Sequence, residues 1–222
     1  MINLSERWQA EAASARVGLL CVVNVPNLPD HSGLCTAGKE LEEELRDRYQ
    51  GLDRPSLRDL PVFAAYDSFY RNFRKTYHVQ LQLESVLLKG KSIHFPSALV
   101  GAMFLAELKT GLLTAAHDLA ALELPLTADI AQGNESYQQL SGKSQELKTG
   151  DLFIRDDKGV ISSVIYGPDH RTRIQPGTNQ AVFTTYGPIG ISREQVLEEL
   201  EILEDYLRIF APQLERKVRV VF

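Results

Sequence analysis

The sequence predicts a mixed α+β fold for this chain of 222 residues, because helical and strand signals occur in blocks along the chain. An apolar strand lies near the amino end, several short strands and turns follow in the middle, and a long amphipathic helix comes late. The length is sufficient for one domain with a substantial core. No internal repeat or Ser/Gly linker divides the chain. We therefore expect one domain over residues 1–222, with an antiparallel component and without a doubly wound nucleotide fold.

The amino-terminal third contains one strand signal and two helix signals. The run 17-VGLLCVVNV-25 is rich in β-branched residues and is typical of a buried strand. The segment 39-KELEEELRDRY-49 has its acidic residues first and its basic ones last, which favours a surface helix. Residues 59-DLPVFAAYDSFYRNFRK-75 predict a second helix. The aromatic side chains on its inner face are Phe63, Tyr66, Tyr70 and Phe73.

Two more helices are expected before the middle of the chain. The segment 79-VQLQLESVLLKG-90 carries both a strand-like alternation and a helical spacing, and we favour a helix that ends at Gly90. The apolar segment Ala98–Lys109 predicts a central helix, with Ser97 at its start and Gly111 after its end.

The second half begins with strand signals and ends with the clearest helix. The segment 152-LFIRDDKGVISSVIYG-167 predicts a hairpin with its turn at Asp156–Gly159, and 181-AVFTTY-186 predicts a further strand. Residues 192–210 predict a helix that opens with a capping box and presents an apolar stripe to the core. The last segment, 217-KVRVVF-222, alternates as a strand does.

Composition excludes some classes of partner and compartment. The hydrophobic fraction of 44% and the charged fraction of 24% are those of an ordinary globular protein. A net charge of −5 gives no global basic field, so DNA is not an expected partner, although RNA can still bind to a local basic face. No segment is typical of a secretory signal or a membrane span. Two cysteines without CxxC spacing favour a cytoplasmic protein with reduced thiols.

Several motifs that mark common enzymes are absent from the sequence. There is no Walker loop, GxGxxG, HExxH or GxSxG motif. The five histidines show no metal-ligand spacing, so neither a metal nor a cofactor is expected.

The segment 107-ELKTGLLTAAHD-118 is the first polar cluster with residues suited to chemistry. Ester hydrolysis needs a group that orients water and donors for the developing oxyanion, and Glu107, Thr114 and His117 are of the right types. In the structural alternative, Asp118 caps a short helix while His117 covers a strand edge. Neighbouring side chains diverge on a helix or strand, so His117 and Asp118 are not expected to act as a dyad.

Two further polar clusters are candidate binding loops. In 131-AQGNESYQQLSG-142, Gly133 and Asn134 predict a turn with Glu135 beyond it. That carboxylate either lines a pocket or is solvated on a loop. In 166-YGPDHRTRIQPGT-178, the arginines are suited to a phosphate or carboxylate, or they close the loop on itself by pairing with its aspartate.

The order of these motifs resembles that of a known domain. The segments that carry the resemblance are 69-FYRNFRK-75, 89-KG-90, 99-LV-100, 111-GLLTAAHDL-119, 131-AQGNESY-137, 151-DLFIRDDKGVISS-163, 169-DHRTRIQPGT-178 and the closing helix. They resemble the B3/B4 domain of the phenylalanyl-tRNA synthetase beta subunit, in the free-standing form found in prokaryotes. The resemblance covers about residues 66–212 and extends more weakly to the first strand, with residues 1–65 packed onto this core.

The resemblance implies a layered β/β/α fold and a pocket for an aminoacyl group. In the synthetase this domain clears mischarged tyrosine from tRNA, because binding alone cannot exclude a close analogue of phenylalanine strongly enough. The implied pocket lies between the apolar helix, the AHDL segment and the Gly-Asn-Glu loop. The resemblance also implies His117 and Glu107 as candidate catalytic residues. The candidate substrate-binding residues are Phe104, Thr114, Asp118, Gly133, Asn134, Glu135, Arg171 and Thr172.

The sequence departs from the family's pattern along the central helix. Related free-standing domains carry Asp, Asn and Ser where Gly101, Phe104 and Glu107 stand here, and 77-YHVQ-80 replaces an Arg-Pro-Ser lead-in. The pocket is therefore remodelled, and deacylation of Tyr-tRNA does not carry over.

Three functions remain open on the sequence alone. The chain is a binding module for tRNA or an aminoacyl conjugate, a hydrolase that acts in trans on a mischarged aminoacyl-tRNA, or a scaffold whose long helix mediates self-association. We do not expect it to aminoacylate tRNA by itself. Fold analogy is a poor guide between such functions, and the sequence does not determine the oligomeric state.

Overall fold

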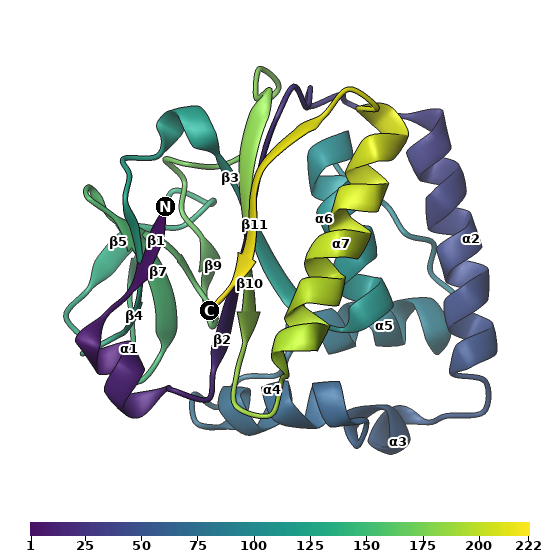
Figure 1. Ribbon diagram of the computed structural model, residues 1–222. Helices are drawn as coiled ribbons and strands as arrows, with labels where there is room; N and C mark the ends of the chain where they lie inside the picture. Colours follow the sequence, from purple (N-terminus) through teal and green to yellow (C-terminus); the bar gives the residue numbers. More distant parts are fainter.

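A computed structural model describes all of residues 1–222 and shows three layers, with two β-sheets beside each other and helices on the far side of one of them (Figure 1). The four-stranded sheet is antiparallel, and its strands in spatial order are β11 (Glu215–Val221), β2 (Arg16–Val23), β10 (Gln180–Gly187) and β3 (Leu113–Asp118). The five-stranded sheet has the order β1 (Ile2–Leu4), β4 (Leu126–Ile130), β7 (Leu152–Asp156), β8 (Gly159–Ser163) and β9 (Gly167–Pro168). A small hairpin, β5 (Ser136–Gln138) and β6 (Ser144–Glu146), extends from it. The predicted mixed α+β class with β/β/α layers is confirmed.

Helices cover the outer face of the four-stranded sheet and close its lower end (Figure 1). Those on the outer side are α2 (Ser32–Arg48), α5 (His78–Leu87), α6 (Ala98–Thr110) and α7 (Arg193–Phe210). The short α3 (Arg54–Arg58) and α4 (Pro61–Arg71) lie below them, α1 (Glu6–Glu11) packs against β4, and a 3-10 turn, η1 (Leu119–Ala121), follows β3. A connected core of 50 buried hydrophobic residues runs from Ile2 to Val221 and joins all three layers.

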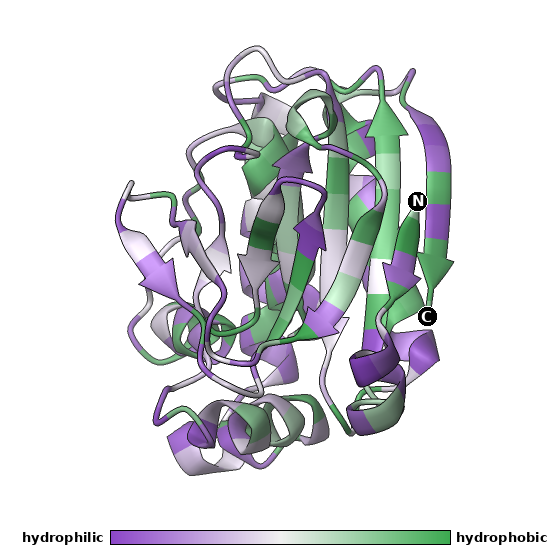
Figure 2. Ribbon diagram, turned by 90° about the vertical axis from the view of Figure 1, so that its left-hand side faces the viewer, coloured by the Kyte–Doolittle hydropathy of each residue, from purple (hydrophilic) through white to green (hydrophobic).

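The central strand β2 is apolar on both faces because each face is covered. Residues 17–22 are buried without exception, and the long inner strands are green along most of their length in Figure 2. The face toward the helices approaches α7 closely at Gly18, where a Cβ atom would lie 2.6 Å from Val196 Cγ1 and 3.1 Å from Leu200 Cδ1. The absence of a side chain at Gly18 therefore sets how near α7 packs to the sheet.

The strongest local sequence signals formed the expected elements. Helix α7 begins with the predicted capping box between Ser192 and Gln195. Its inner stripe is fully buried and consists of Val196, Leu200, Leu203 and Leu207. The ambiguous segment after residue 78 is a helix, as favoured. Helix α6 ends at Gly111, whose φ of 80° is the left-handed conformation that glycine adopts without strain. The hairpin β7–β8 turns at Asp157–Lys158 as expected.

Some expected boundaries differ from the structure, and one expected cap lacks its hydrogen bond. Helix α2 begins at Ser32, seven positions before the predicted start, because its first turns consist of small residues without a marked polar pattern. Helix α4 ends at Arg71 rather than Lys75, since Arg74 adopts a left-handed φ of 55°. Ser97 occupies the cap position of α6, but its side chain makes no capping hydrogen bond.

Candidate functional site: a cavity at the edge of the four-stranded sheet

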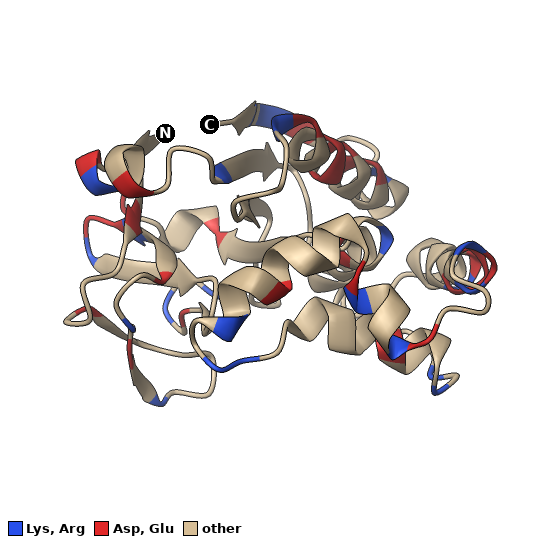
Figure 3. Ribbon diagram, turned by 90° about the horizontal axis from the view of Figure 1, so that it is seen from below, with Lys and Arg blue, Asp and Glu red and all other residues tan.

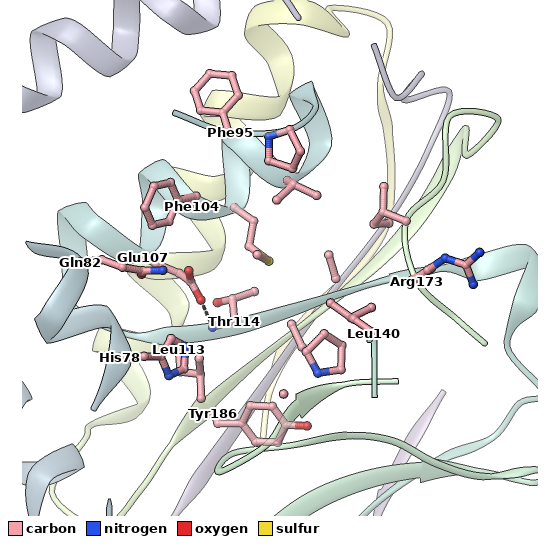
Figure 4. A pocket seen from close by; sticks show the side chains of 18 of the residues that line it. His78, Gln82, Phe95, Phe104, Glu107, Leu113, Thr114, Leu140, Arg173 and Tyr186 are labelled. Atoms are coloured by element: carbon pink, nitrogen blue, oxygen red, sulfur yellow. Dashed lines mark hydrogen bonds between the residues drawn. The ribbon is translucent and has the colours of Figure 1, made fainter. Parts of the chain in front are cut away.

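A cavity of about 580 Å³ lies where α5 and α6 meet the β3 edge of the four-stranded sheet and the β8–β9 turn (Figure 4). This volume is within the usual range for pockets that bind small molecules. The residues that line it are His78, Gln82, His94, Phe95, Pro96, Val100, Met103, Phe104, Glu107, Leu113, Thr114, Ala115, Ala116, Leu140, Ser163, Gly167, Pro168, Arg173, Ile174 and Tyr186. Half of them are hydrophobic, so the cavity is suited to a ligand with an apolar body and a few polar groups.

The apolar wall comes mainly from α6 and the segment before it. Val100, Met103 and Phe104 repeat at helical spacing and line the cavity with Phe95. Gly101 allows this arrangement, because a Cβ atom there would lie 2.5 Å from the Phe95 ring. The glycine in the central helix therefore makes room for an aromatic side chain in the cavity wall.

Glu107 is a buried acid in this wall. Its side chain is only 4% exposed, and Oε1 accepts a hydrogen bond of 2.8 Å from the Thr114 amide (Figure 4). The turn at Gly111 makes this contact possible, because it returns the chain along α6 and places the start of β3 beside the last turn of the helix. Burial raises the pKa of Glu107 well above its usual value, and the nearby charge of Glu199 raises it further.

Helix α5 contributes two polar side chains to the same region. Gln82 Oε1 is buried and has no hydrogen-bond partner, which is an uncommon and costly state for an amide oxygen. His78 lies one turn earlier, with Nδ1 3.3 Å from the Tyr70 hydroxyl. Desolvation by the surrounding side chains lowers the pKa of His78, so the imidazole is neutral at pH 7.

Arg173 stands at the opposite end of the cavity from Gln82 and Glu107 (Figure 4). Its Nη1 contacts the carbonyl oxygen and the Nδ1 atom of His170, and no carboxylate pairs with it. The cavity therefore has a cation at one end and acceptor oxygens at the other.

The candidate residues from the sequence divide into two groups. Phe104, Glu107 and Thr114 line the cavity. The seven that do not line it are His117, Asp118, Gly133, Asn134, Glu135, Arg171 and Thr172. The expected meeting of the apolar helix, the AHDL segment and the Gly-Asn-Glu loop in one pocket is therefore corrected: the first two adjoin the cavity, whereas the loop does not.

His117 is fully buried between the sheets and is not in the cavity wall. Its Nδ1 lies 2.8 Å from Thr172 Oγ1, and the Thr172 hydroxyl in turn donates to Asp169. Burial lowers the pKa of His117 to about 3, so the ring is neutral at physiological pH. These contacts tie the 169–173 loop to β3.

Asp118 faces away from His117, as expected for neighbours on a strand. Its Oδ1 accepts the Ala120 amide at 3.0 Å, and its Oδ2 accepts the Thr178 hydroxyl at 2.6 Å. The first bond caps the 3-10 turn η1, and the second holds the end of the following loop. Asp118 is thus engaged within the protein.

Arg171 is an anchor for the β7–β8 hairpin. It forms a bidentate pair with Asp156, with distances of 2.9 and 2.8 Å, and the Asp156 side chain is fully buried. Arg171 Nε also lies 3.7 Å from Asp169 Oδ2. The guanidinium of Arg171 therefore closes its own loop, which was one of the two interpretations the sequence left open.

Glu135 closes the turn that precedes it. Its carboxylate accepts hydrogen bonds of 3.0 to 3.2 Å from the amides of Gln132, Gly133 and Asn134. These bonds lower the pKa of Glu135 against the opposing effect of burial. Gly133 and Asn134 are solvent-exposed in the same turn, away from the cavity.

Sequence reasoning missed five polar residues of the cavity, namely His78, Gln82, His94, Ser163 and Tyr186. The separation of His78 and Gln82 by four positions places them on one face of a helix, so their pairing was detectable once α5 was assigned. Ser163 and Tyr186 come from different sheets, and no local pattern brings them together. No group of three or more His, Cys, Asp or Glu side chains has a geometry suited to a metal ion. None of the helices combines the length and hydrophobicity needed to cross a membrane.

The model of the B3/4 domain family matches residues 64–200, which is more than half of the chain. The chain belongs to the B3/4 domain family. The resemblance seen in the sequence, to the B3/B4 domain, is thereby confirmed at the level of the family. Helices α4 to α6 and β3, which line or support the cavity, all lie within the matched part of this B3/4 protein or begin just before it.

Among solved structures, the B3/4 protein is similar to an N-terminal fragment of the phenylalanyl-tRNA synthetase beta subunit from Pyrococcus horikoshii. The TM-score is 0.51 at 10% sequence identity, and the similarity covers 100% of this chain and 53% of the other. At that identity the likeness shows the fold alone, and the chain spans about half the length of that fragment. A comparison with curated proteins gives no match.

Proposed function

We propose that this B3/4 protein binds an aminoacyl group in the cavity between α5, α6 and β3, as carried at the 3′ end of an aminoacyl-tRNA. Two comparisons support this proposal: the match to the B3/4 domain family, and the similarity to a fragment of an aminoacyl-tRNA synthetase subunit. The site supports it as well, because the polar groups of the cavity complement those of an aminoacyl ester.

The observation that carries the proposal is the pair of acceptors at one end of an apolar cavity. Gln82 Oε1 has no partner, and Glu107 has a second carboxylate oxygen beside the one that accepts the Thr114 amide. A ligand ammonium group supplies the hydrogen-bond donors and the positive charge that these acceptors lack. The walls formed by Phe95, Met103 and Phe104 then enclose an apolar amino-acid side chain.

A non-hydrolysable ligand tests the proposal directly. The probe is 3′-deoxy-3′-(L-phenylalanylamino)adenosine, in which an amide replaces the ester, and its affinity is measured by calorimetry and by the shift in melting temperature. We expect saturable binding that N-acetylation of the probe weakens at least tenfold, because acetylation removes the ammonium group.

Matched variants locate the interaction. Glu107→Gln keeps an acceptor for the Thr114 amide and removes the charge, so affinity should fall by about tenfold, or about 1.4 kcal/mol. Glu198→Gln changes an exposed acid of α7 and should leave affinity unchanged. Equal binding of the acetylated and free probes, or no binding of either, would contradict the proposal.

Hydrolysis of the bound ester is the second candidate function, and His78 is the observation that favours it. This neutral imidazole lines the same cavity as Glu107, and its Nδ1 is near the Tyr70 hydroxyl, which leaves Nε2 to orient a water molecule. His117, the candidate from the sequence, is enclosed between the sheets.

The hydrolytic candidate is tested with a panel of mischarged aminoacyl-tRNAs. Release of the amino acid should be abolished in His78→Ala and unchanged in His31→Ala, which removes a histidine outside the cavity wall. Binding of the amide probe without release of any amino acid from the panel would leave the protein as a binding module.

A further inference from the structure

A second hollow, entirely different in character from the cavity, lies on the underside of the molecule between α3, α4 and α5. Its volume is about 760 Å³, and nearly all of the side chains that line it are charged or polar. The lining residues are Arg54, Pro55, Arg58, Asp59, Asp67, Arg71, Arg74, Lys75, Thr76 and Gln80, and we call them the basic groove. Figure 3 looks onto this underside and shows Lys and Arg in blue along it.

The net charge of the basic groove is positive, whereas that of the whole protein is negative. The chain as a whole has a net charge of −5, yet five cationic and only two acidic residues line the groove. Because exposed charges more than about 8 Å apart are largely screened at physiological salt, a ligand in the groove experiences the local excess of cations.

Buried carboxylates hold three of the guanidinium groups in place. Asp67 accepts from Arg58 Nη2 at 2.9 Å and from Arg71 Nε at 2.6 Å. Glu84 accepts from Arg54 Nε at 3.1 Å and is itself held by Gln80 at 2.8 Å.

The fixed guanidinium groups keep most of their donors free. The side chains of Arg54, Arg58 and Arg71 remain 61%, 46% and 66% exposed, whereas both acids are less than 10% exposed. A guanidinium carries five N–H donors, so each arginine presents fixed donors to the groove.

Two further cations in the groove have no acidic partner. Arg74 and Lys75 connect α4 to α5, and neither makes an ion pair or a side-chain hydrogen bond within the chain. Arg74 has a φ of 55°, at a position where glycine would be unstrained. Lys75 Nζ lies 5.7 Å from the centre of the Tyr166 ring, a cation–π distance.

The basic groove adjoins the cavity along α5. Gln80 faces the groove, whereas His78 and Gln82 line the cavity. On the other side, Tyr166 contacts Lys75 and immediately precedes Gly167, which lines the cavity. An extended anion on the groove therefore passes close to the cavity.

We infer that the basic groove binds the phosphodiester backbone of a folded RNA. The guanidinium groups of arginine match the geometry of phosphate oxygens, and the groove has no aromatic side chain in its lining on which unpaired bases would stack. Recognition is thus by the backbone and independent of sequence. The choice of RNA over another polyphosphate rests on the proposed function.

The test uses the full chain and an uncharged RNA hairpin, so that its outcome does not depend on the cavity. Arg74→Ala/Lys75→Ala is the informative variant, because it removes cations that no buried carboxylate needs. Lys39→Ala/Arg193→Ala is the matched control, since it also removes one exposed lysine and one exposed arginine, from α2 and α7.

Fluorescence anisotropy over a range of salt concentrations should give one clear pattern. We expect the first variant to bind the hairpin about tenfold more weakly, with a slope of log affinity against log salt that is shallower by about 1 to 2, since each phosphate contact contributes about 0.9. The control should lie within twofold of the wild type, and Glu107→Gln should not change hairpin affinity.

Three outcomes would overturn the inference. These are no binding of the hairpin at 50 mM salt, equal binding by both double variants, and tighter binding to vesicles of phosphatidylglycerol and phosphatidylcholine than to RNA. In each case the aminoacyl probe can still bind to the cavity, so failure of the groove and failure of the proposed function are distinguishable.

Discussion

His117 Nδ1 lies 2.8 Å from Thr172 Oγ1, and this bond joins the carboxyl end of β3 to the loop that follows β9. Because the Thr172 hydroxyl donates to Asp169, its oxygen accepts from the imidazole, and the ring proton is on Nδ1. The sequence suggested His117 as a candidate catalyst, whereas the structure places it in a buried chain of hydrogen bonds between the two sheets.

Replacement of His117 should affect stability rather than ligand binding. His117→Ala leaves a cavity and removes the donor to the Thr172 oxygen, so we expect the free energy of unfolding to fall by roughly 2 to 4 kcal/mol. Urea unfolding measures the loss, and the affinity for the aminoacyl probe should stay within about twofold. Lost binding or hydrolysis in a variant of normal stability would return His117 to the functional site.

The buried acid Glu199 should make stability depend on pH. It accepts the hydroxyls of Thr110 and Thr114 at 2.6 and 3.0 Å, and burial raises its pKa to about 7. Since the folded state binds this proton more tightly than the unfolded state, the stabilisation is full below about pH 4.5 and is lost as pH rises through 7.

Glu199→Gln removes this dependence, so its stability relative to the wild type should rise between pH 5 and pH 8, by up to about 3 kcal/mol. Unfolding in urea at four pH values measures the difference. Glu198→Gln, at the exposed neighbouring position, is the control and should show no such trend. A constant difference between Glu199→Gln and the wild type would contradict the assigned pKa.

The bidentate pair between Arg171 and Asp156 should be essential for the β7–β8 hairpin. Arg171→Met removes a cation from a carboxylate whose side chain is fully buried, and an unpaired buried charge costs about 3 to 5 kcal/mol. Amide exchange in β7 and β8 should accelerate. Arg155→Met is the control. Arg155 Nε lies 3.9 Å from Asp129 Oδ2 in a more exposed and weaker pair, so the free energy of unfolding should fall by less than about 1 kcal/mol.

The contact between Gly101 and Phe95 should control the shape of the cavity. In Gly101→Ala the new methyl group collides with the Phe95 ring, so the ring must move and affinity for the aminoacyl probe should change several-fold. Stability should change by less than about 1 kcal/mol, because alanine favours the helix and the ring is partly exposed.

Gly38→Ala in α2 is the matched control for Gly101→Ala. Its methyl group would lie 3.6 Å from Leu105, an ordinary contact, so probe affinity should not change. An unaltered affinity in Gly101→Ala would show that Phe95 does not contact the ligand.

Binding of an ammonium group beside Glu107 should release a proton. Burial holds the pKa of Glu107 well above its usual value in the free protein, and a bound cation favours the charged form. The affinity for the probe should therefore increase with pH up to about pH 7 and fall above about pH 8, where the α-amino group of the probe itself loses its proton. Calorimetry in two buffers of different ionisation enthalpy measures the proton released, and Glu107→Gln should release none.

The sequence by itself determined the elements whose signals are local. The capping box at Ser192, the left-handed stop at Gly111 and the apolar run of β2 each depend on residues within one or two turns of each other. Such patterns act through backbone hydrogen bonds and side-chain periodicity, so a single segment contains them. The order of these segments also carried the likeness to the B3/4 family.

Only the tertiary structure decided which polar residues share a site. On β3, the Thr114 hydroxyl meets Glu199 of α7, whereas His117 meets Thr172 on the other side of the sheet. The alternation of side chains along a strand places Thr114 and His117 on opposite faces of the sheet, but it does not determine on which face the cavity lies. That choice depends on how α5 and α6 pack against the edge of the sheet, through contacts between residues far apart in the chain.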